Sequence, residues 1–262
     1  IAIALDVSGS MDGLLDSARQ RIWDIINEFS TIKPRPTLRV ALLTYGRDNY
    51  NAEDGWVKID QQLTTNLDAI SEALFAYTTN GGSEYVARVV DKAVKNLDWS
   101  KDPTALRIVV VAGNEAATQD PSISIETAMK EAVGHGIVVN SIFCGPEREG
   151  ISTGWQRVAT LTDGLYASID QNQAAVASIA TPMDAEITKL NEELNKTYIA
   201  YGASGGTSLA NQAAQDMNAE KMSAPAMASR AVTKASGYYS NSNWDLVDAL
   251  KGGKKIEELK EE

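Results

Sequence analysis

Apolar runs alternate with segments of helical periodicity through the first 180 residues of this 262-residue chain. Four runs are rich in aliphatic residues: IAIALDV at 1–7, LRVALLTY at 38–45, LRIVVVA at 106–112 and IVVNSIFC at 137–144. Between them, apolar residues recur at helical spacing over 14–29, 67–77, 84–97 and 125–133. Such runs are typical of strands buried on both faces, and strands joined through helices pair in parallel. We therefore expect an α/β fold in which helices flank a doubly wound, mostly parallel sheet.

Shorter segments complete this pattern. WVKID at 56–60 is a short, edge-like strand, and we expect one antiparallel edge strand near Trp56 to Ile59. A helix is expected over 154–161 and a last strand over 164–169.

The composition changes near Thr181, after which the chain is rich in Ala, Asn, Ser and Met. We expect an α/β domain over 1–180 and a helical C-terminal extension over 181–262, with a helix after Pro182, a helical stretch over 209–235 interrupted at Pro225, and a short helix over 244–250. Two apolar stripes mark these helices: Ile187, Leu190, Leu194 and Tyr198, and then Trp244, Val247 and Leu250.

The extension holds too few apolar residues for a core of its own. We expect both stripes to be covered by the α/β domain or by a second copy of the chain, which would be self-association. Trp155 and Trp244 are expected to pack the extension against the α/β domain.

Composition excludes several function classes. The net charge of −11 repels phosphate backbones, which disfavours nucleic acid as a partner. No apolar run approaches the ~20 residues that cross a bilayer. Cys144 is the single cysteine, so there is no internal disulfide and no cysteine-based zinc site, and it is expected to be buried and inert. His135 is the single histidine, which argues against a His-centred triad.

The sequence offers no catalytic set. It contains neither a phosphate-binding G-x-x-x-x-G-K-[ST] loop nor a G-x-S-x-G elbow. A strand-end Asp nucleophile would want a second Asp two residues on, where this chain has Ser8. We therefore expect no catalytic residues and no enzymatic activity.

Three polar clusters follow elements whose ends are expected to meet at one edge of the sheet: DVSGS at 6–10, NGGSE at 80–84 and GNE at 113–115. Ligands bind at the carboxyl ends of the strands in open parallel sheets. Asp6, Ser8 and Ser10 place one carboxylate and two hydroxyls on one side of a tight turn. Hard oxygen ligands of this kind suit Mg²⁺, Ca²⁺ or Mn²⁺. We expect Asp6 to face solvent, so that Asp6→Ala removes cation binding and leaves the fold intact.

The sequence DVSGSM, placed directly after an apolar strand, resembles the Asp-x-Ser-x-Ser signature of von Willebrand factor A (VWA) domains. The resemblance covers roughly residues 1–180 and implies a metal ion-dependent adhesion site (MIDAS) built from three loops. NGGSE fits the second loop and AGNEA, at 112–116, fits the third. The remaining residues resemble the helical extension of a group of bacterial secreted A-domain proteins.

The sequence departs from the family pattern in two loops. In the second loop, Ser83 or Glu84 stands where the family has Thr. In the third, Asn114 replaces the usual Asp, which removes a negative charge and should weaken cation binding unless Glu115 takes its place. The alternative is a degenerate site, in which Asp6 and the serines only satisfy amides of the turn.

The resemblance implies a non-enzymatic, divalent-cation-dependent protein-binding module of the adhesion type. A Glu or Asp of the partner would fill an open coordination position of Mg²⁺, Ca²⁺ or Mn²⁺. Two alternatives stay open: a structural or assembly scaffold with a degenerate metal site, and an accessory subunit of a cytoplasmic metal chelatase.

Both ends of the sequence bear on its cellular context. The chain opens at Ile1 inside a strand and ends in a charged helical pattern, KKIEELKEE, so we expect it to be a fragment of a longer protein. Its expected location is the periplasm or the cell surface and extracellular space.

Overall fold

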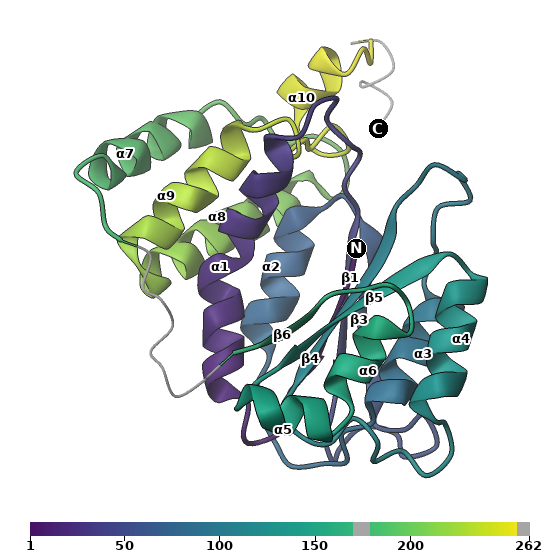
Figure 1. The fold of residues 1–262 in the computed structure, drawn as a ribbon. Coiled ribbons are helices and arrows are strands. Elements are labelled where there is room, and N and C mark those ends of the chain that lie inside the picture. Colours follow the sequence, from purple (N-terminus) through teal and green to yellow (C-terminus); the bar gives the residue numbers. More distant parts are fainter. Residues whose placement is uncertain (170–178, 256–262) are drawn as a thin grey trace. The chain divides into compact units, whose positions relative to one another are not determined.

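The computed structural model describes residues 1–169 and 179–255 and divides into two compact units (Figure 1). The first unit consists of Ile1–Ser17, Arg39–Thr64 and Ala76–Val176. The second consists of Ala18–Leu38, Thr65–Phe75 and Ala177–Glu262. The second unit therefore draws on residues from both sides of residue 180.

A six-stranded sheet, counted over the described residues, forms the centre of the first unit in the order β3-β2-β1-β4-β5-β6. Its strands are β1 (Ala2–Asp6), β2 (Val40–Tyr45), β3 (Val57–Thr64), β4 (Arg107–Gly113), β5 (Ile137–Phe143) and β6 (Tyr166–Ser168). All neighbouring strands pair in parallel except β2 and β3, which are antiparallel. The predicted doubly wound sheet with one antiparallel edge strand is confirmed.

The aliphatic runs occupy the centre of this sheet, where both faces are covered. Ala2 and Ala4 of β1 and Val109 and Val111 of β4 have no exposed surface. Since β1 and β4 are parallel neighbours, their carboxyl ends lie at the same edge. This pairing brings the loops that follow Asp6 and Gly113 together.

Helices of the first unit pack on the sheet (Figure 1). They are α3 (Val86–Asn96), α4 (Ile125–Gly134), α5 (Glu147–Ser152) and α6 (Trp155–Thr160). The predicted valine face of α3 is buried, and the Ser124 hydroxyl caps α4 by accepting from the Thr127 N–H at 3.2 Å. Helix α5 was not predicted, because six residues are too few to show a helical period.

The second unit is helical. It contains α7 (Asp184–Asn195), α8 (Gly205–Met222), α9 (Ala224–Ala235) and α10 (Leu246–Lys251). Most of α1 (Asp12–Ser30) and of α2 (Leu67–Ala76) also belongs to it. The predicted break at Pro225 is the start of α9, where the Ser223 hydroxyl accepts from the Ala226 N–H and proline occupies the first turn. The additional C-terminal helices are therefore present.

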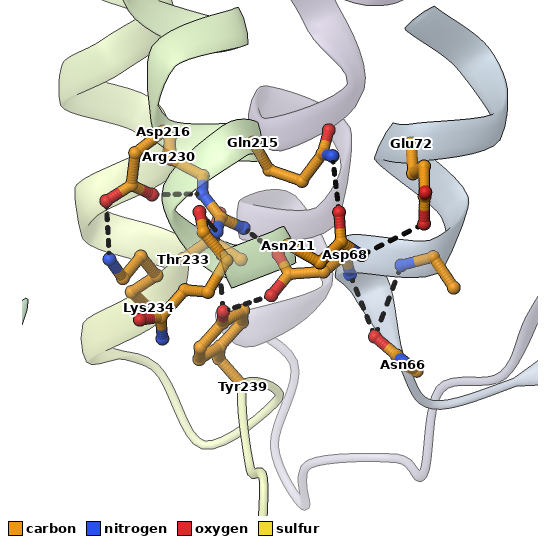
Figure 2. Close-up of polar contacts among 12 residues, drawn as sticks. Asn66, Asp68, Glu72, Asn211, Gln215, Asp216, Arg230, Thr233, Lys234 and Tyr239 are labelled. Carbon is orange, nitrogen blue, oxygen red and sulfur yellow. Dashed lines mark hydrogen bonds and ion pairs between the residues drawn. The ribbon is translucent and has the colours of Figure 1, made fainter. Parts of the chain in front are cut away.

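A buried cluster of charges connects α2, α8 and α9 of the second unit (Figure 2). Arg230 of α9 is fully buried and contacts Asp68 of α2 at 2.5 Å and Asp216 of α8 at 2.9 Å. Lys234 contacts Asp216 at 2.8 Å, and the Tyr239 hydroxyl donates to Asp68. These five residues are called the Arg230 network below. Burial raises the pKa of Asp216, but the charges of Arg230 and Lys234 outweigh it and hold that pKa below its ordinary value.

Helix α1 joins the same network from its other side. The Arg230 guanidinium lies 4.5 Å from the centre of a Trp23 ring, an arrangement in which a cation is attracted to the aromatic face. Asn27 donates to the Ser229 carbonyl at 3.0 Å and accepts from the Thr233 hydroxyl at 2.8 Å. Sequence segments on both sides of residue 180 are thus bound together by buried polar contacts.

The two apolar stripes of the extension are covered only in part within one chain. Tyr198 stacks on Trp244, which is 3% exposed. By contrast, Leu190 is 62% exposed, and Val247 and Leu250 also remain accessible. Coverage of these residues by the α/β domain or by a second copy of the chain stays a prediction.

No described helix combines the length and the apolar character that crossing a membrane requires.

Candidate metal site

Asp6, the last residue of β1, is the centre of the candidate site. Its side chain has no exposed surface, so the expectation that it faces solvent was wrong. The strand end lies beneath the loops that follow it, and Asp6 Oδ1 accepts from the Ser8 N–H at 2.8 Å. Within the described part of the chain, Asp6 Oδ2 has no hydrogen-bond partner. A buried carboxylate oxygen without a partner is costly, and a proton or a bound cation would offset this cost.

The first and third loops meet above Asp6. The Ser8 and Ser10 hydroxyls lie 3.3 Å apart, and the Asn114 side-chain amide donates to Ser10 Oγ at 2.8 Å. The structure therefore brings Asp6, Ser8, Ser10 and Asn114 together, as expected for parallel strands that end at one edge. Their role as metal ligands stays a prediction.

The second loop approaches Asp6 across Gly46. The Asn80 N–H donates to the Val7 carbonyl at 3.0 Å, which ties this loop to the first. A methyl group built on Gly46 would lie 2.8 Å from Asp6 Oδ1 and 3.0 Å from Glu84 Cγ, so these two side chains flank the glycine. Of the two alternatives for this loop, the geometry favours Glu84. Ser83 is half-buried in the same turn.

The electrostatics of the site disfavour an ionised Asp6 in the absence of a cation. Burial raises the pKa of Asp6 to about 7, hydrogen bonds from Ser8 and from the backbone of Asn114 act in the opposite direction, and the negative charge of Glu84 raises it further. The pKa of Glu84 is itself raised, first by burial and then by the charge of Glu115. Clustered carboxylates with raised pKa values are typical of sites that bind a cation or a proton.

Glycines make room for this cluster, and the sequence interpretation did not identify their role. Gly46 has φ of +85°, which other residues rarely adopt. A methyl group on Gly82 would lie 2.6 Å from backbone atoms of Gly46, and one on Gly113 would lie 3.1 Å from Asp6 Oδ2. The sequence could have indicated this role, because Gly46 directly follows β2 and Gly113 ends β4, and both therefore lie at the strand ends where the site is expected.

Trp155 supports the third loop through a hydrogen bond to its backbone. Its ring nitrogen donates to the Glu115 carbonyl at 2.7 Å, and its ring packs on Phe143 with the ring centres 5.9 Å apart. Trp155 is fully buried among residues of the first unit. The expectation that Trp155 packs the extension against the α/β domain was therefore wrong; it supports the site instead. Trp244 stacks on Tyr198, which belongs to the extension itself.

The donor set fits a hard divalent cation. It offers the free oxygen of Asp6, two hydroxyls, the Asn114 amide oxygen and the carboxylate of Glu84, which are the oxygen ligands that Mg²⁺ and Ca²⁺ prefer. Within the described residues no group of three or more His, Cys, Asp and Glu side chains is placed to hold a metal. A metal here would therefore depend on the serine hydroxyls and on the Asn114 amide.

Neither Cys144 nor His135 forms part of this site. Cys144 is buried, and burial followed by the charge of Asp6 raises the pKa of its thiol to about 12, which keeps it protonated. His135 is exposed and lines a pocket of about 230 Å³ with Arg107 and Ile137. Those two residues begin β4 and β5, so this pocket lies at the opposite end of the strands from Asp6.

Comparison with known proteins identifies the family of this chain. A family model described as the von Willebrand factor type A domain matches residues 1–179. No curated protein matches the chain.

Several solved structures share the fold. The chain is similar to proximal thread matrix protein 1 from the mussel byssus, in a structure with a zinc-occupied MIDAS motif, with 14% identity, a TM-score of 0.50, and coverage of 66% of this chain and 41% of that one. Another structure of the mussel protein gives 12% identity, a TM-score of 0.50, and coverage of 78% and 60%. The SpRpn10 VWA domain gives 16% identity, a TM-score of 0.47, and coverage of 64% and 86%. The chain thus spans 41% to 60% of the mussel chains, and identities this low show the fold alone.

Proposed function

Because the chain belongs to the von Willebrand factor type A family, we propose that it is a non-enzymatic protein-binding module whose binding depends on a divalent cation. The observation that carries this proposal is the buried oxygen Asp6 Oδ2, which has no hydrogen-bond partner in the described residues. The mussel structure with zinc in its MIDAS motif gives further support, since a protein of this fold holds a metal there.

The chemistry of the donors indicates how the module would work. Asp6, Ser8, Ser10 and Asn114 would hold the cation, with Glu84 beside them. Of the four residues that would hold the cation, only Asp6 carries a charge, so a bound Mg²⁺, Ca²⁺ or Mn²⁺ keeps positive charge with which to attract a Glu or Asp of a protein partner. The chain's own residues would fix the position of the cation and of the arriving carboxylate.

Calorimetric titration of the wild-type chain and of Asp6→Ala with Mg²⁺, Ca²⁺ and Mn²⁺ tests the proposal. We expect the wild type to bind at least one cation with micromolar-to-millimolar affinity and Asp6→Ala to bind none. Asp102→Asn is the control, because Asp102 is exposed and precedes β4 at the opposite end of the sheet. Wild-type affinity in Asp6→Ala would contradict the assigned site. A silent wild type would instead favour a scaffold with a degenerate site, and Asn114 in place of Asp is the feature that keeps this alternative open.

We also propose that the protein works outside the cytoplasm, in the periplasm or at the cell surface. The support is the resemblance of its extension to that of bacterial secreted A-domain proteins. Fractionation of the source cells tests this, and recovery in the cytosol would contradict it.

A further inference from the structure

The three loops of the candidate site are tied to one another in pairs. Here the first loop is 7–11, the second 77–85 and the third 114–124. The first and second are joined by the Asn80 N–H, which donates to the Val7 carbonyl at 3.0 Å. The first and third are joined through Ser10 and Asn114 at 2.8 Å. Both ties are short polar contacts at the site itself.

The second and third loops are tied differently, by an ion pair outside the donor set. Arg88 lies in the first turn of α3, four residues after Glu84. Its Nε donates to Asp120 Oδ2 and its Nη2 to Asp120 Oδ1, each at 2.9 Å. The Asp120 side chain is 1% exposed and that of Arg88 17%. Two parallel charge-assisted hydrogen bonds, largely shielded from water, fix the third loop relative to the first turn of α3, which directly follows the second loop.

Asp120 is also part of the local structure of the third loop. Its Oδ1 accepts from the backbone N–H groups of Ser122 and Ile123 at 2.8 and 3.2 Å. The carboxylate therefore holds the backbone of its own loop and the guanidinium of α3 at the same time. A shift of Arg88 would be transmitted to the loop that carries Asn114.

Arg88 is itself held in one conformation. Its guanidinium lies 5.9 Å from the centre of the Tyr85 ring, and that ring meets Trp56 edge to face with the centres 5.4 Å apart. A methyl group on Gly55 would lie 2.5 Å from Arg88 Cγ, so the side chain packs directly on this glycine. Gly55 has φ of +70°, a conformation that suits glycine. The packing leaves the guanidinium little freedom to follow a displaced Asp120.

We propose that Arg88 and Asp120 are positioning residues of the cation site, which fix Glu84 relative to Asn114; the inference rests on the proposed function. Mg²⁺ demands near-octahedral oxygen ligands at about 2.0–2.1 Å, whereas Ca²⁺ accepts about 2.3–2.6 Å and irregular geometry. Loosening the link between the two loops should therefore weaken Mg²⁺ binding more than Ca²⁺ binding. A residue that served stability alone would not change the ratio of the two affinities.

The test is calorimetric titration of Arg88→Met and Asp120→Asn with Mg²⁺ and with Ca²⁺, well below the unfolding temperature. Substitutions that disturb the orientation of metal ligands typically lower metal affinity about 10–100-fold. We expect a loss of about tenfold or more for Mg²⁺, a clearly smaller loss for Ca²⁺, and no additional loss in the double variant. Arg88→Lys keeps the charge but not the paired hydrogen bonds, and should recover part of the affinity.

Arg157→Gln provides the matched control. Arg157 of α6 pairs with Glu126 of α4 at 2.7 Å, so it also links two helices of the first unit, but both side chains of this pair are exposed, unlike those of Arg88 and Asp120. Its Mg²⁺ and Ca²⁺ affinities should equal those of the wild type. If Arg88→Met does not fold, Asp120→Asn decides, because it keeps Oδ1 for Ser122 and Ile123 and removes the negative charge and the acceptor of Arg88 Nε.

The outcomes separate the two proposals. A wild type that binds no cation overturns the proposed function and this inference with it. If the wild type binds, Asp6→Ala does not, and the Arg88 and Asp120 variants keep the wild-type Mg²⁺ to Ca²⁺ affinity ratio, the inference alone is overturned. A selective loss of Mg²⁺ affinity in both variants, with Arg157→Gln unchanged, supports it.

Discussion

The Asp6 site and the Arg230 network both bury carboxylates, and they stabilise them in different ways. In the Arg230 network, Asp68 and Asp216 each contact a buried cationic side chain within 3 Å, and Asp216 contacts two. At the Asp6 site, Oδ2 of Asp6 has no hydrogen-bond partner in the described chain, and the nearby charge that shifts its pKa is that of Glu84. The Asp6 site therefore places two negative charges side by side, whereas the Arg230 network pairs negative charges with positive ones.

This difference separates a structural cluster from a candidate binding site. A buried carboxylate that meets arginine and lysine is satisfied within the chain and has no need of a ligand. A buried carboxylate flanked by another carboxylate is satisfied only when a proton or an external cation arrives. The two clusters should therefore respond in opposite directions to the same kinds of substitution.

The largest effect is expected from Arg230→Met. The substitution removes the cation that Asp68 and Asp216 share and leaves Asp68 without its ion pair, so we expect the free energy of unfolding to fall by about 3–5 kcal/mol. Urea unfolding followed by circular dichroism measures it. Arg157→Gln breaks an exposed ion pair and should change stability by less than about 1 kcal/mol. Equal stabilities for the two variants would mean that the network is not what holds the second unit together.

Neutralising one carboxylate in each cluster should change stability in opposite directions. At pH 8 and in the presence of a chelator, Asp6→Asn removes an unpartnered buried charge and should raise the free energy of unfolding by about 1–3 kcal/mol. Asp216→Asn removes the negative partner of Arg230 and Lys234 and should lower it by about 1.5–3 kcal/mol. Chemical unfolding of both variants gives the comparison. A loss of stability in Asp6→Asn would show that its charge is already compensated within the chain.

The pH dependence of cation binding sharpens the contrast further. The pKa of Asp6 is about 7 in the folded chain against an ordinary value of 3.8, so without a cation the folded state keeps a proton that the unfolded state has lost between these values. Stability from this group is therefore fully present below pH 4 and is lost as the pH rises through about 7.

A cation must displace the same proton, so its affinity should rise by about tenfold per pH unit up to about pH 7 and then level off. Titrations with Mn²⁺ between about pH 5.5 and 8.5 measure this, and Asp68→Asn serves as a control at the other cluster. A cation affinity that does not change between about pH 5.5 and 7 would rule out Asp6 as the titrating ligand.

The smallest effect concerns the second loop of the site. Cation affinity depends on the number of charged ligands, so Glu84→Gln should lower it by about three- to tenfold. Ser83→Ala should leave it within about twofold, since Glu84 is the residue of this loop that flanks Gly46 opposite Asp6. Parallel titrations with Ca²⁺ compare them. The reverse order would make Ser83 the ligand and Glu84 a neighbouring charge.

The sequence by itself predicted the strands of the sheet and the residues that gather at its edge, because these features depend on residues that are close along the chain. The aliphatic runs gave the central strands, because burial on both faces demands uninterrupted apolar residues. The short, charge-interrupted segment WVKID gave the antiparallel edge strand β3. Asp6, Ser8 and Ser10 could be named together because one turn carries all three. Asn114 could be added because parallel strands end at one edge of the sheet.

Only the tertiary structure decided which charges are buried and with what. Asp6 and Asp216 are the same type of residue, yet Asp6 lies beside Glu84 and Asp216 lies beside Arg230 and Lys234. Arg230 and Asp68 are separated by more than half of the chain, and no local period links them. Backbone geometry follows from local sequence, because sterics and hydrogen bonding act between near neighbours. The energy of a buried charge depends on the surfaces that close over it, and these come from distant parts of the sequence.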